Sequence, residues 1–196
     1  MFRWLALVVL LGCLSISTYY RHRARLESET IPRRKEGTLV LAIRSLAGLA
    51  VLMSILAHTV APRWMAWATF PRPGWVPWVG AMLGLLTIPA AYWVFASLGR
   101  NVSETVLPKQ QHELVTTGPY RWIRHPLYTT GLALLLAIGL MVASWLLLLV
   151  AFIALAFVKS LVVPLEERQL LAKFGNRYRA YMLQTGRFLP RVPGRG

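Results

Sequence analysis

Aspartate is absent from this chain of 196 residues, and its acidic side chains are seven glutamates. Lys and Arg together number 22, so the formal net charge is +15 at pH 7. Such an excess of positive charge is typical of proteins that bind nucleic acid or an anionic membrane. Here the basic residues lie between and after apolar segments instead of on one hydrophilic domain. We therefore expect anionic lipid headgroups as the counter-charge and no nucleic-acid partner.

Cysteine and histidine are scarce as well. The single cysteine, Cys13, excludes an intrachain disulfide and a cysteine-cluster metal site. The four histidines, which show no HExxH or ExxH spacing, are His22, His58, His112 and His125. A GxSxG elbow, a GxGxxG turn and a Walker-type loop are also missing from the sequence. We therefore expect no bound metal, and find little support for a nucleophilic serine or cysteine.

Apolar residues, by contrast, are abundant: 56% of the chain is hydrophobic and the mean hydropathy is +0.51. This composition is typical of integral membrane proteins. Three apolar segments have about the length that a bilayer crossing needs, roughly 20 residues. They run from Trp4 to Tyr20, from Leu39 to Val60 and from Trp75 to Leu98.

A fourth apolar run, from Leu127 to Pro164, is too long for one crossing. As a single straight helix it would extend about 57 Å, nearly twice the roughly 30 Å of a hydrocarbon core. We therefore predict two helices with a tight turn near Ala143-Ser144. The resulting fold class is an all-α integral membrane protein with about five transmembrane helices, of which the last two form a helical hairpin.

The basic residues of the loops predict the orientation of these crossings. The segments 21–38 and 99–126 and the tail from Lys159 are rich in Lys and Arg. The loop 61–74 holds only Arg63 and Arg72, among prolines and tryptophans. Because short cytoplasmic loops carry excess Lys and Arg, we expect the N-terminus outside and the C-terminus in the cytoplasm.

The first apolar segment has an alternative interpretation as a signal peptide, since Leu11-Gly12-Cys13 faintly resembles a lipoprotein cleavage site. Cleavage there would place the basic segment 21–38 outside. The charge bias of the loops argues against this interpretation.

Beyond Pro164 the sequence is no longer uniformly apolar. Apolar residues recur at helical spacing among basic ones: Leu165, Leu170, Leu171, Phe174, Tyr178 and Tyr181. This pattern predicts an amphipathic helix at the cytoplasmic interface, interrupted near Gly175.

Ionisable side chains gather at both ends of the predicted hairpin. His125 precedes Pro126, which is tolerated in the first turn of a helix, so the imidazole would lie beside free backbone donors that favour an anion. The hairpin would bring His125 and Tyr128 close to Glu166 and to the loop that follows His112. A pocket with both signs of charge at the membrane face suits a zwitterionic ligand beside a lipid-like one.

Each of these groups also has a simpler interpretation. Arg121 and Arg124 could be headgroup contacts, and the aromatic residues around them could be interfacial anchors. Glu166-Glu167 could be the polar start of the tail helix, where carboxylates favour the helix dipole. Their occurrence together at both ends of one hairpin favours a binding site.

The run from Leu114 to Tyr128 carries a more specific resemblance. Together with Glu166-Glu167-Arg168, Phe174-Gly175 and Tyr178-Arg179-Ala180-Tyr181, it resembles the isoprenylcysteine carboxyl methyltransferase family, and the related phospholipid methyltransferases share much of this pattern. The similar region runs from about Leu98 to Pro190. It implies transmembrane helices in residues 1–97 and a methyltransferase-like catalytic region in residues 98–196.

The resemblance implies an integral membrane enzyme that uses S-adenosyl-L-methionine. A methyl group would pass to a carboxylate or an amine of a lipidic or membrane-associated acceptor, of which a prenylcysteine is one example. The cofactor contacts implied for this chain are His112, Glu113, Leu114, Val115, Tyr120, His125, Pro126, Leu127, Tyr128 and Glu166. The candidate catalytic residues are Arg124, His125, Tyr128 and Glu167.

In one respect the chain departs from the family. Where eukaryotic carboxyl methyltransferases have an arginine facing the substrate carboxylate, this chain has Val162, with Lys159 three residues earlier. Arg124 or Lys159 could take that place, or the acceptor could be another amphiphile. An ionised carboxylate acceptor needs no general base, whereas an amine or hydroxyl needs one, for which Glu167, His125 and Tyr128 are candidates.

Two other functions stay open on the sequence. One is an NADPH-dependent membrane reductase of the sterol-reductase type, and the other is a non-enzymatic membrane adaptor or transporter component.

Overall fold

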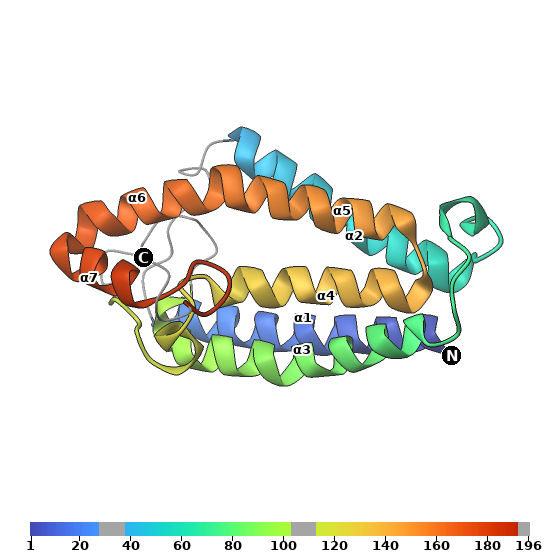
Figure 1. Cartoon of the computed structure of the whole chain (residues 1–196), viewed down its shortest axis with the longest axis horizontal. Helices are drawn as coiled ribbons and strands as arrows, with labels where there is room; N and C mark the ends of the chain where they lie inside the picture. The colour runs from blue at the N-terminus through green and yellow to red at the C-terminus, as the bar shows by residue number, and fades with distance from the viewer. Residues whose placement is uncertain (28–37, 103–112, 192–196) are drawn as a thin grey trace.

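The computed structural model describes residues 1–27, 38–102 and 113–191. In these ranges the chain forms α-helices joined by short 3₁₀ and π turns, and no extended strand occurs there. The α-helices are α1 (Phe2–Glu27), α2 (Thr38–Val60), α3 (Val76–Leu98), α4 (Pro126–Val142), α5 (Trp145–Phe157), α6 (Val163–Phe174) and α7 (Asn176–Gln184). In Figure 1, α1, α3 and α4 run side by side. Helices α5 and α6 follow one another on the side of α4 that faces away from α1 and α3. The predicted all-helical fold is confirmed.

The helices that match the predicted crossings are apolar, and three of them are long. Phe2–Leu26, Val76–Asn101 and Trp145–Phe174 each have the length and composition to cross a membrane, and Gly48–Val60 and Pro126–Val142 are shorter apolar helices. Large apolar side chains of α5, including Leu149, Phe152 and Ile153, are exposed on the outside of the bundle. Exposed apolar side chains along a helix suit contact with lipid, so the structure is that of an integral membrane protein.

The core is centred where α1, α3 and α4 meet, and it combines small side chains with larger ones such as that of Met141. Ala6 of α1, Ala81 of α3 and Ala137 of α4 are all buried in it. At Gly80 of α3 an added Cβ would lie 2.7 Å from the backbone nitrogen of Met141, so only glycine fits there. Small residues at such contacts let helix backbones approach closely in membrane proteins.

The turn of the hairpin lies at the predicted position. Ala143 adopts the left-handed conformation, with φ 52° and ψ 44°, which ends α4. Ser144 then caps α5, because its side chain accepts a hydrogen bond from the Leu147 N–H at 3.3 Å. The indole of Trp145 donates to the carbonyl of Trp67 at 3.0 Å, so the loop before α3 packs on this turn.

At its other end the hairpin differs from the prediction. We expected the apolar run to finish at Pro164 and a separate tail helix to follow, but the helix continues without a break from Trp145 to Phe174. A π turn over Val158–Val162 joins α5 to α6, and Pro164 lies in the first turn of α6. Proline has no N–H to donate to the preceding turn, so a locally widened turn accommodates it. The 30 residues extend about 45 Å, so α6 projects beyond a hydrocarbon core of roughly 30 Å.

The interruption predicted near Gly175 is confirmed. Gly175 has a φ of 53° and separates α6 from α7. The chain therefore reverses after α6, and Figure 1 shows α7 returning towards the start of α4. This reversal brings the tail to the open end of the hairpin, where the charged residues lie.

Candidate functional site

A buried carboxylate, that of Glu167, lies at the centre of a polar cluster between the start of α4, the middle of α6 and the end of the tail. Its Oε1 lies 3.0 Å from Nε of Arg124 and 3.3 Å from Nε2 of His125. Its Oε2 lies 2.6 Å from Nη2 of Arg187. Glu167 is 4% exposed, so its charge is buried and depends on these basic partners for compensation.

His125 lies between two carboxylates. Its Nε2 faces Glu167, and its Nδ1 lies 3.6 Å from Oε2 of Glu166. Two aromatic rings lie near the imidazole, with centroid distances of 5.9 Å to Tyr128 and 6.2 Å to Phe188. His125 occupies the N-cap position of α4, directly before Pro126, as the sequence predicts.

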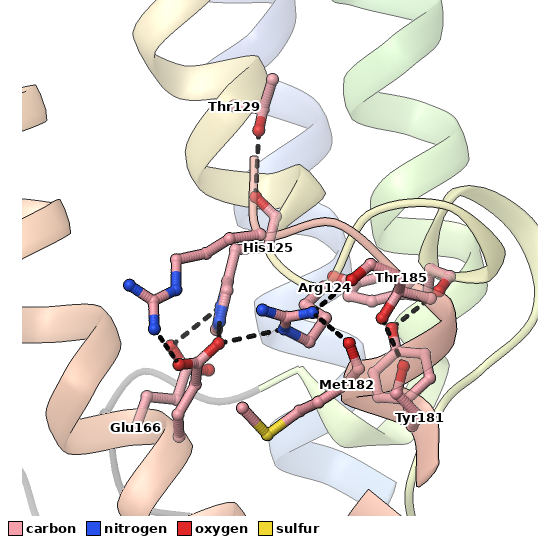
Figure 2. A network of polar contacts seen from close by, with 10 residues as sticks. Arg124, His125, Thr129, Glu166, Tyr181, Met182 and Thr185 are labelled. Carbon is pink, nitrogen blue, oxygen red and sulfur yellow. Dashed lines mark hydrogen bonds and ion pairs between the residues drawn. The ribbon is translucent and has the colours of Figure 1, made fainter. Parts of the chain in front are cut away.

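Arg124 joins the cluster to the tail. Beyond its contact with Glu167, its Nη1 donates to the carbonyl of Met182 at 3.0 Å and to that of Thr185. Figure 2 shows the guanidinium of Arg124 directed at these two residues, at the end of α7. The Arg124 side chain is only 10% exposed, so it is more than a contact for lipid headgroups, which was the simpler interpretation of this residue.

The residues that follow α7 form a C-terminal strap, residues 185–189, that lies along residues 122–125. The Arg124 N–H donates to the carbonyl of Gly186 at 2.8 Å, and the His125 N–H donates to that of Arg187 at 3.1 Å. In return the Gly186 N–H donates to the carbonyl of Trp122 at 3.1 Å. This short parallel pairing holds the strap directly against His125.

Two tyrosines support the same region. The hydroxyl of Tyr181 donates to the carbonyl of Tyr120 at 2.6 Å, so α7 is tied to the turn before α4. Burial raises the pKa of the Tyr120 phenol well above its usual value and raises the pKa of Tyr181 to about 12. Both phenols are therefore neutral hydrogen-bond donors at neutral pH.

Comparison with known proteins identifies the family. The sequence profile of the phospholipid methyltransferase family matches residues 75–177. The chain belongs to this family. Its match covers α3, the hairpin and α6, and ends just after α7 begins.

Two curated relatives are proteins of metal resistance. The nickel-cobalt-cadmium resistance protein NccN of Alcaligenes xylosoxydans xylosoxydans is 34% identical over 119 residues, which cover 59% of this chain and 53% of that protein. The cobalt-zinc-cadmium resistance protein CzcN of Cupriavidus metallidurans is 32% identical over 116 residues, which cover 59% of this chain and 52% of that protein. The chain thus spans about half the length of these relatives.

A solved structure has a similar fold. It is that of the eukaryotic intramembrane Ras methyltransferase ICMT, isoprenylcysteine carboxyl methyltransferase, with a TM-score of 0.58 and 22% sequence identity. The similarity covers 79% of this chain and 55% of that one. At this level of identity the match supports the fold alone.

Most residues that the resemblance implies for the cofactor lie around this cluster. His125 and Pro126 are buried at the start of α4, Leu127 and Tyr128 are half-buried in its first turn, and Glu166 of α6 lies 3.6 Å from His125.

The loop residues of the predicted set are placed differently. Glu113 forms an ion pair with Arg100, and its N–H donates to Oδ1 of Asn101 at 3.1 Å, which ties it to the end of α3. Leu114 and Val115 follow as half-buried residues, whereas His112 lies outside the described residues.

Two further residues of the cluster had no sequence prediction. Arg187 and Phe188 come from the strap, and neither is among the residues that the sequence predicts for the site. The small residue Gly186 offers a partial signal, because a Cβ there would lie 1.8 Å from the carbonyl oxygen of Leu189. A requirement for glycine at position 186 indicates a tight turn, but it does not reveal which residues the turn contacts.

Replacing Glu167 tests the buried ion cluster. In Glu167→Gln the buried cation of Arg124 and the partly exposed cation of Arg187 lose their common counter-charge, so we expect a loss of folding stability of about 3 kcal/mol. The matched change Glu113→Gln removes an exposed ion pair with Arg100 and should cost less than about 1 kcal/mol. Thermal unfolding in detergent, with trypsin digestion of the tail, measures both. Equal stability of the two variants would contradict a structural role for the cluster.

Proposed function

We propose that the chain is a membrane methyltransferase that uses S-adenosyl-L-methionine and acts on a lipidic or membrane-associated acceptor. Membership of the phospholipid methyltransferase family supports the reaction class. The observation that carries the proposal for the site is the position of His125 between Glu166 and Glu167, at the open end of an apolar hairpin. Neither the reductase nor the adaptor hypothesis is favoured by the family.

The donor set of the cluster suits this cofactor. S-adenosyl-L-methionine carries a cationic sulfonium and amine, a carboxylate and an adenosine, so it needs both signs of charge and apolar contacts. Glu166 would engage its cationic or hydroxyl groups and His125 its carboxylate, because charge-assisted hydrogen bonds are the stronger ones. Tyr120, Leu127 and Tyr128 would cover the adenosine. When bound, the cofactor supplies a methyl group that is already activated by the positive sulfur.

The contribution of the protein is therefore placement. A rigid cluster that holds two reactants in line removes much of the entropic barrier to their reaction. Glu167 and Arg124, which are committed to each other and to the tail, maintain this geometry. Because Glu167 already accepts from three basic side chains, it is a poor candidate for the base that an amine acceptor would require, and His125 and Tyr128 remain candidates.

The acceptor would reach the site along the membrane. Exposed apolar side chains of α5 lead towards the π turn, where Val162 is buried and Lys159 is exposed. π turns inside α-helices occur frequently at functional sites. Since Arg124 is engaged by Glu167 and the tail, Lys159 is the better candidate to meet an acceptor carboxylate. A methyl ester releases methanol in alkali and an N-methyl group does not, so alkaline treatment of the labelled product distinguishes the two acceptor classes.

The polar cluster would face the cytoplasm, with the N-terminus outside. This orientation rests on the basic loops and on the exposed tryptophans near the hairpin turn, such as Trp64 and Trp67, which suit a membrane interface. Anionic headgroups would then surround the basic tail on the cytoplasmic side.

The single cysteine makes this orientation testable. With Cys13→Ala as the background, we expect a membrane-impermeant maleimide to label Trp64→Cys in intact cells and to label Arg177→Cys only after lysis. Trp64 and Arg177 are both exposed, so accessibility in the folded protein is matched. The reverse pattern would contradict the orientation and place the cluster outside the cell.

Titration calorimetry with S-adenosylhomocysteine tests the function. We expect the purified protein to bind this product of the cofactor, and Glu166→Ala and His125→Ala each to weaken binding by about tenfold or more, because each removes a polar side chain that would hydrogen-bond to the ligand. Arg177→Gln, a change at an exposed position of α7, should bind like the wild type. Thermal unfolding of each variant checks that it is folded. Absence of binding by the wild type would reject the proposed function.

A further inference from the structure

The C-terminal strap, residues 185–189, contacts the polar cluster and the start of α4 through its residues from Thr185 to Phe188. Gly186 and Arg187 pair through their backbones with Trp122, Arg124 and His125. The carbonyl of Phe188 accepts from the hydroxyl of Thr129 at 3.0 Å, which ties the strap to the first turn of α4.

Two side chains of the strap also lie against the polar cluster. Nη2 of Arg187 lies 2.6 Å from Oε2 of Glu167, and the ring of Phe188 lies 6.2 Å from that of His125. Arg187 thus approaches Glu167 from one side while Arg124 approaches Oε1 from the other. The two arginines hold the carboxylate in one orientation, with Oε1 also facing Nε2 of His125 at 3.3 Å.

The strap lies outside the part of the chain that the family profile matches. That match ends at residue 177, whereas the strap begins eight residues later at Thr185. The contacts of Arg187 are therefore a property of this chain that family membership does not assign.

We propose that Arg187 is a positioning residue for the cofactor site, an inference that rests on the proposed function. Together with Arg124 it fixes Glu167, and Glu167 in turn fixes the imidazole of His125 towards Glu166. Arg187 acts through these two side chains and need not touch the ligand. Without Arg187, Glu167 keeps one arginine partner instead of two, and the strap loses its ion pair with α6. The imidazole of His125 is then no longer held in one orientation.

Two adenosine ligands separate this role from a general effect on folding. S-adenosylhomocysteine carries the amino-acid group that His125 would hold, whereas 5′-methylthioadenosine lacks it. Loss of His125 orientation should weaken the first ligand alone. A loosened fold should weaken both.

The experiment measures the dissociation constants of both ligands for the full chain in detergent by titration calorimetry. For Arg187→Gln we expect S-adenosylhomocysteine to bind at least about tenfold more weakly, because a charged contact that supports the site is lost, and 5′-methylthioadenosine to bind as in the wild type. Arg187→Lys keeps the charge and should recover part of the affinity. The matched control is Arg191→Gln, which removes another tail arginine, one that donates to the carbonyl of Leu183. It should change neither constant.

The outcomes separate the two proposals. If the wild type binds S-adenosylhomocysteine and Arg187→Gln binds it equally well, or if both ligands weaken in parallel, the positioning role is overturned while the proposed function stands. A wild type that binds neither ligand contradicts the proposed function, and the inference fails with it.

Discussion

The buried carboxylate of Glu167 is the constraint on which the site depends. Burial of a charge is costly unless partners compensate it, and here the partners come from distant parts of the chain. Arg124 and His125 precede the hairpin, whereas Arg187 follows the tail helix. One side chain on α6 therefore draws both ends of the hairpin and the C-terminal segment to one place.

The membrane-spanning helices bring these polar residues together. Close packing of α3 on α4 at Gly80 fixes the first half of the hairpin, and the capped turn at Ala143 and Ser144 returns the chain as α5. The unbroken helix from Trp145 to Phe174 then carries Glu166 and Glu167 beyond the apolar layer, where charged groups can meet water and a soluble cofactor. The π turn lies where the apolar and the polar halves of this helix join.

Much of this arrangement could be predicted from the sequence, because its causes are local. The length of the apolar run requires a turn, and Pro126 and Gly175 mark a helix start and a helix break. The meeting of His125 with Glu166 and Glu167 follows from the hairpin. The continuous helix through Pro164 and the pairing of Arg187 with Glu167 depend on long-range geometry that no local pattern reveals. The roles of the site residues and the division of the chain near residue 97 stay predictions, and His112 lies outside the described residues.

The central claim is that the start of α4, the middle of α6 and the strap together bind one ligand. Hydrogen–deuterium exchange of the full chain, with and without S-adenosylhomocysteine, tests it most directly, since bound ligand slows the opening of the backbone it contacts. The account predicts that exchange slows together in peptides covering residues 118–129, 163–174 and 181–189, while peptides of the hairpin turn around Ala143 are unchanged. Protection confined to one of the three segments, or protection at the hairpin turn instead, would contradict it.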